Sequence, residues 1–162
     1  MRPWNPLSGT GQPPAPGLMR SQSHCVQYHE AFGKFMPKRS AEDPRLTMVT
    51  EIARALPEAT RQIYGSHAQF LIRKKTFSYF LDNHHGDGIV AITGKVLPGD
   101  NKALAEAQPR RFYLPAYVAS RGWVALRLDV GKIDWDEVRE LLLGSYTLIA
   151  PKRLAEAVKA EM

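Results

Sequence analysis

The sequence predicts an α+β domain with a mainly antiparallel sheet of about five short strands and helices packed on one face. Two observations lead to this prediction. Short runs of strand-forming residues follow one another with only tight turns between them, which is typical of hairpins. The longest helical pattern, over residues 135–149, comes after these runs and has one apolar face that needs a sheet to cover it.

The chain divides near residue 45. Residues 1–45 hold seven of the twelve prolines and no sustained apolar period, so we expect a disordered Pro-rich N-terminal extension. Residues 46–162 are the predicted domain, and their number suits one hydrophobic core. No apolar run approaches the roughly 18 residues of a membrane span. The single cysteine, Cys25, excludes an internal disulfide, so we expect a cytoplasmic protein without a membrane partner.

The first half of the domain begins with a helix. Apolar residues recur at helical spacing from Leu46 to Leu56, and Pro57 ends the helix. Three strand runs come next, the first two joined by a tight basic turn: residues 69–73, 76–81 and 88–95. Asn101 is the expected N-cap of a short helix over residues 102–108.

The second half holds two more strands and the long helix. The strands, residues 111–114 and 122–128, flank a Pro-Ala-Tyr turn. Asp134 is the expected cap of the long helix, and Glu137 follows three residues later, as in a capping box. Pro151 suits the first turn of a last helix, over residues 152–159.

Alternation along the strands assigns the two faces of the sheet. The set expected in the core is Phe70, Ile72, Val124, Leu126 and Leu128. The set expected on the second face is Gln69, Leu71, Arg73, Trp123, Ala125 and Arg127. A half-open face that carries Trp123 and Arg127 is either a binding platform or a dimer surface, and the pattern does not choose between them.

The loop over residues 82–88, with sequence DNHHGDG, is the most conspicuous local signal. His84, His85 and Asp87 are residue types that bind divalent metals or transfer protons. Asp, Asn and Gly are also the residues that turns require, and adjacent histidines do not easily face one ion. We interpret the loop as a solvated turn and His67 as a half-buried structural histidine, and expect neither metal nor cofactor.

No enzyme template fits the chain. The segment Ile92-Thr93-Gly94-Lys95 lacks the spacing of a phosphate-binding loop. Ser120 and Ser145 lack the setting of a nucleophile elbow. We therefore expect a protein that is not an enzyme.

Basic residues are placed where phosphate contacts usually arise, at a hairpin tip, before strands and at a helix start. They are Arg73, Lys74, Lys75, Arg110, Arg111, Arg121, Lys152 and Arg153. The rings of Tyr113, Tyr117 and Trp123 alternate along the chain with Arg110, Arg111, Arg121 and Arg127, and bases can stack on such rings. Packing of Tyr117 and Trp123 under the helices explains these two residues at least as well. The net charge of +6 is shared equally: residues 1–45 have six Lys or Arg and three Asp or Glu, and residues 46–162 have sixteen and thirteen. The domain alone is therefore only weakly basic.

A series of spaced motifs resembles the MmcQ/YjbR-like family of small α+β proteins. The motifs are, in order, Pro115-Ala116-Tyr117, Gly122-Trp123-Val124, Asp134-Trp135-Asp136-Glu137-Val138, Ser145-Tyr146 and Ala150-Pro151-Lys152. The resemblance covers roughly residues 46–154. Two features depart from the family pattern: the Pro-rich front, and Arg73-Lys74 where many relatives have a Gly-rich turn.

The resemblance implies an α+β fold with hairpin wings, compared with a double-wing DNA-binding arrangement. On that analogy the tip at Arg73, Lys74 and Lys75 is one wing, and the connection with Arg121 is a weaker candidate for the second. The leading hypothesis is a non-enzymatic cytoplasmic protein that binds DNA through basic hairpin tips and helix starts. The alternative is a protein-interaction module, for example a homodimer formed through the face with Trp123 and Arg127.

Overall fold

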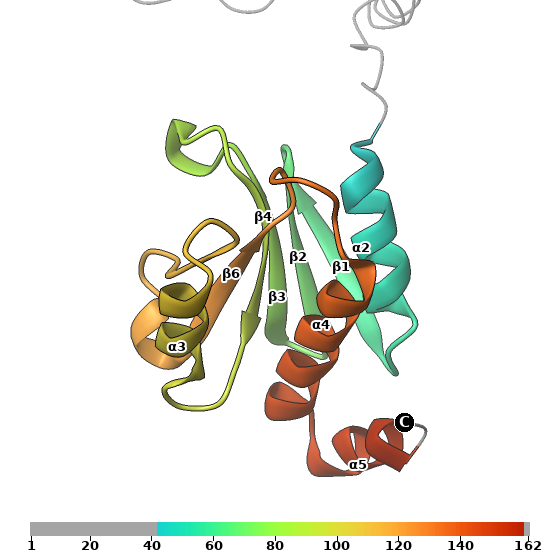
Figure 1. Cartoon of the computed structure of the whole chain (residues 1–162). Helices are drawn as coiled ribbons and strands as arrows, with labels where there is room; N and C mark the ends of the chain where they lie inside the picture. Colours follow the sequence, from blue (N-terminus) through green and yellow to red (C-terminus); the bar gives the residue numbers. More distant parts are fainter. Residues whose placement is uncertain (1–41, 161–162) are drawn as a thin grey trace, which may run out of the picture. The chain divides into compact units, whose positions relative to one another are not determined.

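A computed structural model describes residues 42–160, which form a six-stranded antiparallel sheet with helices packed against it (Figure 1). The strand order is β1-β2-β3-β4-β6-β5. The strands are β1 (Ala59–Tyr64), β2 (His67–Ile72), β3 (Lys75–Asp82), β4 (Val90–Lys95), β5 (Phe112–Tyr113) and β6 (Trp123–Arg127). The predicted α+β class is confirmed. The predicted disorder of the extension falls on residues that lie, except for its last four, outside those described.

Strand β1 is the strand that the sequence pattern missed. It pairs with β2 from Ala59 opposite Ile72 to Tyr64 opposite His67, and lies at the edge of the sheet. Most of its side chains are exposed, so its sequence ATRQIY lacks the regular alternation of a half-buried strand. An exposed edge strand gives only a weak periodic signal.

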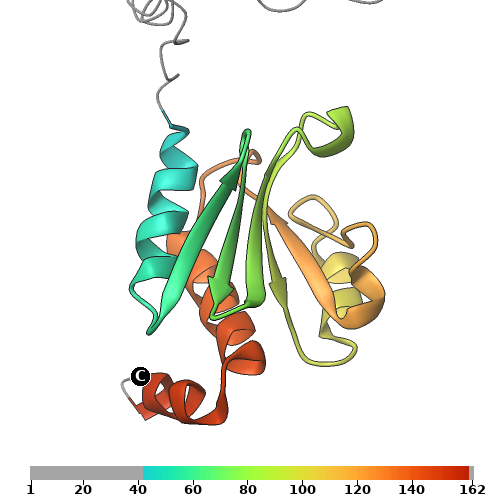
Figure 2. The same ribbon diagram turned by 180° about the vertical axis from the view of Figure 1, so that it is seen from behind.

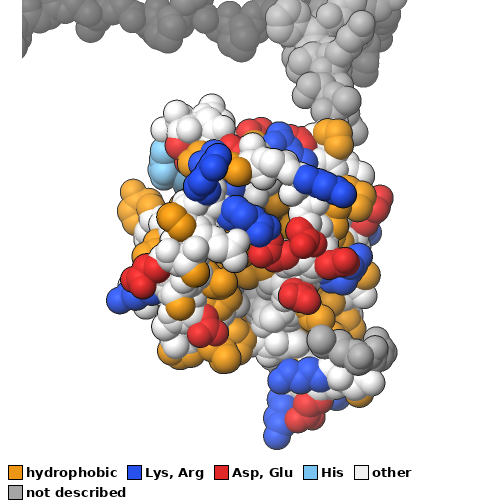
Figure 3. Space-filling view, viewed as in Figure 1, with side chains coloured by type: hydrophobic (Ala, Val, Ile, Leu, Met, Phe, Trp, Pro, Cys, Tyr) orange, Lys and Arg blue, Asp and Glu red, His pale blue; other side chains and the backbone are white. Residues whose placement is uncertain are grey.

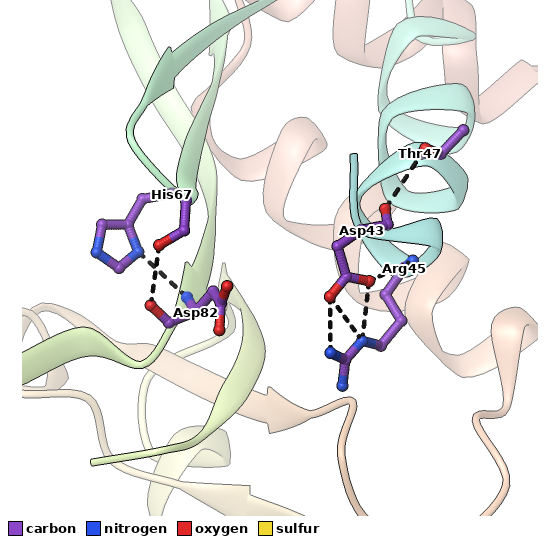
Figure 4. Close-up of polar contacts among 6 residues, drawn as sticks. Asp43, Arg45, Thr47, His67 and Asp82 are labelled. Atoms are coloured by element: carbon purple, nitrogen blue, oxygen red, sulfur yellow. Dashed lines mark hydrogen bonds and ion pairs between the residues drawn. The ribbon is translucent and has the colours of Figure 1, made fainter. Parts of the chain in front are cut away.

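The helices are α2 (Pro44–Arg54), α3 (Asp100–Ala107), α4 (Trp135–Ile149) and α5 (Lys152–Ala160). Helix α2 starts two residues before the predicted pattern, because Asp43 caps it by accepting the Arg45 backbone N–H at 2.8 Å (Figure 4). Asp134 caps α4 as predicted and accepts the N–H groups of Asp136 and Glu137. The Glu137 carboxylate, however, bonds to Arg111 rather than completing the capping box.

Asn101 has a different role from the predicted one. Helix α3 begins one residue earlier than its position, with Gly99 at the N-cap. The Asn101 side chain is buried and donates to the carbonyl oxygens of Ala119 and Trp123, at 2.8 and 3.2 Å. Its amide therefore joins α3 to the start of β6 instead of capping the helix.

The core lies between the sheet and helices α2 and α4, which cover the same face (Figure 1). All of the residues predicted for it are buried: Phe70, Ile72, Val124, Leu126 and Leu128. A β-bulge in the pairing of β2 with β3 lets Phe77 and Phe80 both enter the core. Gly94 permits close approach of α4, because a Cβ there would lie 2.8 Å from Leu141 Cδ1.

The Ser145-Tyr146 motif joins α4 to the sheet. Ser145 Oγ donates to the Phe77 carbonyl and accepts the Lys95 backbone N–H at 2.8 Å. The Tyr146 hydroxyl donates to the Pro57 carbonyl at 2.7 Å. The Ser145 bonds pair backbone groups near the start of β3 and at the end of β4, and the Tyr146 bond pairs a carbonyl of the turn before β1, so the motif is structural.

The second face of the sheet has no long helix over it in the view from behind (Figure 2). The loop between β3 and β4 and the segment after β5 rise beside it. Within residues 42–160, no helix is long and apolar enough to cross a membrane.

Candidate nucleic-acid interface

The antiparallel register brings several predicted basic residues to one end of the sheet. Lys95 at the end of β4 pairs with Trp123 at the start of β6, and the β2–β3 turn lies at the same end of the neighbouring strands. Helix α5 reaches this end, because Arg153 and Arg73 both contact Glu58. We call this region the basic end and define it by its cations: Arg73, Lys74, Lys75, Lys95, Lys102, Arg121, Lys152 and Arg153.

Acidic side chains neutralise only part of the basic end. Arg73 Nε lies 3.0 Å from a Glu58 carboxylate oxygen, and Arg153 approaches the other oxygen at 3.8 Å. The Arg73 hydrogen bond lowers the pKa of Glu58, so this carboxylate stays ionised. Lys74 and Lys75 are exposed at the turn, and within residues 42–160 neither forms an ion pair. The turn therefore presents two free ammonium groups to solvent.

A groove beside α3 adds two cations, Lys95 and Lys102, that the sequence did not single out as binding residues. It has a volume of about 760 Å³ and is lined by Lys95, Lys102 and Arg121, among other residues. No ion pair neutralises these three cations among the described residues. Lys95 and Lys102 stand alone in the sequence, so only the approach of α3 to the start of β6 identifies them as neighbours of Arg121.

The remaining predicted arginines lie toward the opposite end of the sheet, where two of them form ion pairs. Arg111 pairs with Glu137 at the start of α4, and Arg127 pairs with Asp129 at 2.7 Å. The Arg127 side chain lowers the pKa of Asp129 through its hydrogen bond, so both groups stay charged. Arg110 is exposed, and its neighbour Arg111 bonds Arg127 through the backbone. The structure does not bring these residues to the basic end.

Trp123 is buried, which changes the expected platform. Only 8% of its surface is exposed, and its ring lies 5.7 Å from that of Tyr79. The Ala119–Arg121 turn precedes it, and Asn101 bonds its carbonyl. In this structure, therefore, Trp123 does not offer a ring face to a base or to a second copy of the chain.

The loop at residues 82–88 forms a turn, as its Asp, Asn and Gly content predicts. The side chains of Asn83 and Asp87 accept the backbone N–H groups of Gly88 and Ile89, at 2.8 and 2.9 Å. His67 is also structural: its Nδ1 accepts the Asp82 N–H at 3.1 Å (Figure 4).

The helix-covered side of the molecule has no single-sign surface. Basic and acidic side chains are interspersed across it (Figure 3). Interspersed charges of both signs largely cancel at a distance, so this side is poorly suited to an extended polyanion. The free cations of the β2–β3 turn and of the groove beside α3 are therefore the better candidate surface.

A six-stranded antiparallel sheet with helices on one face, and with the Ser-Tyr motif joining α4 to it, defines a class of small α+β domains. A model of the YjbR family matches residues 54–148, and the chain belongs to that family. A crystal structure of the Deinococcus radiodurans protein DR2400, with a DUF419 domain, is similar with a TM-score of 0.54 and 21% identity, over 72% of this chain and 86% of that one. At that identity the likeness concerns the fold. No curated protein matches the chain.

Proposed function

We propose that this protein is a non-enzymatic nucleic-acid-binding protein that contacts the phosphate backbone through the basic end. The observation that supports it is the excess of free cations there. Lys74 and Lys75 project from the β2–β3 turn, and Lys95, Lys102 and Arg121 line the groove beside α3. Phosphate contacts of this kind supply most of the affinity of non-specific DNA binding.

The spacing of the two groups of cations suits a duplex. The β2–β3 turn lies two to three strand spacings from the start of β6, since β6 is two strands from β3 and three from β2. At about 4.8 Å per spacing this distance is about 10–14 Å. It is comparable with the ~12 Å width of the DNA major groove, whose two walls are phosphate backbones. One group of cations can therefore serve each wall.

The acidic residues of this end are consistent with binding of moderate strength. Glu58 and Glu156 contact cations of the tip and of α5, at 3.0 and 3.7 Å. Their partners Arg73, Arg153 and Lys152 are exposed, and exposed pairs of this kind contribute little energy and exchange readily. Arriving phosphates can compete with these carboxylates for the same cations.

The test is binding of the full chain to a labelled duplex at about 50 mM salt, comparing two double variants. K74E/K75E reverses both free cations of the turn, and we expect affinity to fall at least ~10-fold, since two phosphate contacts become repulsive. R110E/K132E changes the net charge by the same amount with two exposed cations outside the basic end. It is the matched control, and we expect it to lose less than ~3-fold.

Equal losses in the two variants would mean that net charge alone drives association and would refute a localised interface. Absence of binding by the unmodified chain at low salt would refute the proposed function itself. Both proteins need matching melting temperatures, so that a difference in affinity reports the surface and not the fold.

A further inference from the structure

A second cavity lies away from the basic end, on the helix-free face of the sheet. It has a volume of about 310 Å³, at the lower end of the range for small-molecule sites. Its floor is made by strand residues, among them Tyr79, Leu81 and Thr93. One wall is the β3–β4 loop and the other is the segment after β5. Both segments rise beside this face in Figure 2.

The lining is rich in rings. Tyr79, Tyr113 and Tyr117 face the cavity together with His84 and His85. The rings of His84 and His85 lie 4.0 Å apart, and the His85 ring lies 6.3 Å from that of Tyr117 on the opposite wall. Flat π-surfaces that converge on one cavity favour a flat aromatic ligand.

Two of these rings are held at an energetic cost. His85 and Tyr117 have φ angles of 60° and 67°, in the left-handed region that residues with a Cβ rarely adopt. Tyr117 is also 83% exposed, so burial of its ring does not repay this strain. A strained backbone that holds an exposed aromatic ring over a cavity is a feature of binding sites.

The charge of the cavity selects the ligand class. Asp87 contributes the one formal charge of the described lining residues, and no Lys or Arg is among them. The nearby Arg127 is engaged by Asp129. Burial, followed by the influence of His85 and His67, lowers the pKa of His84, so this imidazole is neutral at pH 7. An anionic group such as phosphate therefore finds no partner here.

Polar groups remain available for a ligand with N–H donors. Asp87 uses one carboxylate oxygen for the Ile89 N–H, and the other oxygen has no bond among the described residues. The Tyr113 hydroxyl likewise has no hydrogen-bond partner within residues 42–160, and burial raises its pKa, so it is protonated and able to donate or accept. These groups complement a ring that carries an amino group and ring nitrogens.

We propose that the cavity between the β3–β4 loop and the segment after β5 binds an uncharged planar heteroaromatic ring with N–H donors, such as a nucleobase. The ring lies against the tyrosines and histidines, and its amino group donates to Asp87. Such a ring is available both as a free nucleoside and as an unpaired base of a single strand. The site is separate from the basic end and does not depend on the function proposed for it.

The test is a titration of the full ¹⁵N-labelled chain with adenosine, AMP and a short single-stranded oligonucleotide. We expect adenosine to shift the amide signals of residues 84–87, 113–114 and 116–118 with a Kd of about 0.1–5 mM, typical of a fragment-sized ligand. AMP should bind these residues no more tightly than adenosine. An oligonucleotide that shifts these signals at lower concentration than adenosine identifies a strand base as the source, and the reverse order identifies a free nucleoside.

Two variants distinguish the contribution of the Tyr117 ring to binding from its effect on the stability of the fold. Tyr117→Gly removes the ring where glycine also relieves the left-handed backbone, so affinity should fall at least ~5-fold while the melting temperature stays equal or rises. Tyr64→Ala removes another exposed tyrosine, outside the lining, and should leave affinity unchanged. Lack of shifts at the cavity with all three compounds, or tighter binding of AMP than of adenosine at these residues, would overturn the proposal.

Discussion

The two ends of the sheet carry the same kinds of charged residue but arrange them differently. At the end opposite the basic end, where β6 finishes, Arg111 is paired with Glu137 and Arg127 with Asp129. At the basic end, Lys74 and Lys75 have no acidic partner among the described residues, and neither do the cations of the groove. The two ends therefore differ in where the carboxylates lie rather than in how many arginines they have. Cations without a neighbouring carboxylate are available to bind an anion, whereas those beside a carboxylate form structural ion pairs.

The difference also separates the roles of the sequence motifs. The Asp-Trp-Asp-Glu segment supplies a helix cap and a partner for Arg111. Ser145 and Tyr146 anchor α4 to the sheet. These motifs stabilise the fold. The free cations, in contrast, lie in turns and near the ends of helices and strands, where side chains contribute little to the packing. A family resemblance based on such motifs consequently predicts the fold better than the function.

The largest expected effect comes from removing the hydrogen bonds by which Ser145 joins α4 to the sheet. Ser145→Ala removes the partner of both the Phe77 carbonyl and the Lys95 N–H, which are left buried or partly buried. Each unpaired group costs about 1–3 kcal/mol, so we expect the free energy of unfolding to fall by about 2–4 kcal/mol. Urea denaturation measures it.

Ser66→Ala is the control at the opposite end. Its hydroxyl is exposed and bonds the Asp82 carbonyl at 3.3 Å. We expect a change under about 0.5 kcal/mol. A loss for Ser145→Ala as small as that of the control would contradict the anchoring role of Ser145.

The second prediction tests whether the groove beside α3 contributes to duplex binding. K102E/R121E reverses two exposed cations of the groove. We expect duplex affinity to fall about 10-fold at low salt, because two phosphate contacts are lost. Fluorescence anisotropy measures this, and an unchanged affinity would confine the interface to the β2–β3 turn.

A third, smaller effect has the opposite sign. Glu58→Gln removes the carboxylate that engages Arg73 and Arg153 and thereby frees both cations. We expect duplex binding to strengthen about 2- to 5-fold at low salt. Glu137→Gln makes the same change beside Arg111 at the opposite end and should leave affinity nearly unchanged. Weaker binding of the Glu58 variant would show that its carboxylate organises the tip rather than competing with phosphate.

The smallest effect concerns acid stability, to which the ion pairs Arg127–Asp129 and Arg45–Asp43 contribute. The pKa values of Asp129 and Asp43 are lowered in the folded state, chiefly by hydrogen bonds from Arg127 and Arg45. A lowered folded pKa stabilises the protein above the unfolded value of about 3.9, and this stabilisation disappears as the pH falls through the folded pKa. Asp129→Asn should therefore lower stability at pH 6 and make it less dependent on pH below about 4. An unaltered pH profile would contradict this linkage.

Much of the fold follows from local patterns, and its departures have local causes. Alternation assigned Phe70 and Val124 to the core, and capping chemistry located the start of α4. Strand β1 was missed because an exposed edge strand lacks alternation. Asn101 was predicted to be the N-cap of a helix because Asn is favoured there. Its buried amide instead donates to the carbonyl oxygens of Ala119 and Trp123 and so joins α3 to the start of β6.

The candidate site was less predictable because it depends on neighbours that are distant in the sequence. The turn at Lys74 and Lys75 was identified as a run of charge. Lys95 and Lys102 were not, since only the topology places them beside Arg121. The burial of Trp123 was left open, because alternation assigns a face of the sheet but does not reveal which side chains and loops cover that face.

The salt dependence of duplex binding tests the localised interface most directly. The unmodified full chain should give a plot of log affinity against log salt concentration with a slope near −4.5, as expected for about five phosphates neutralised. R110E/K132E should keep that slope, and K74E/K75E should reduce its magnitude by about 2. A slope that changes equally in both variants, or that is near zero in the unmodified protein, would contradict the claim that the basic end is where this protein meets nucleic acid.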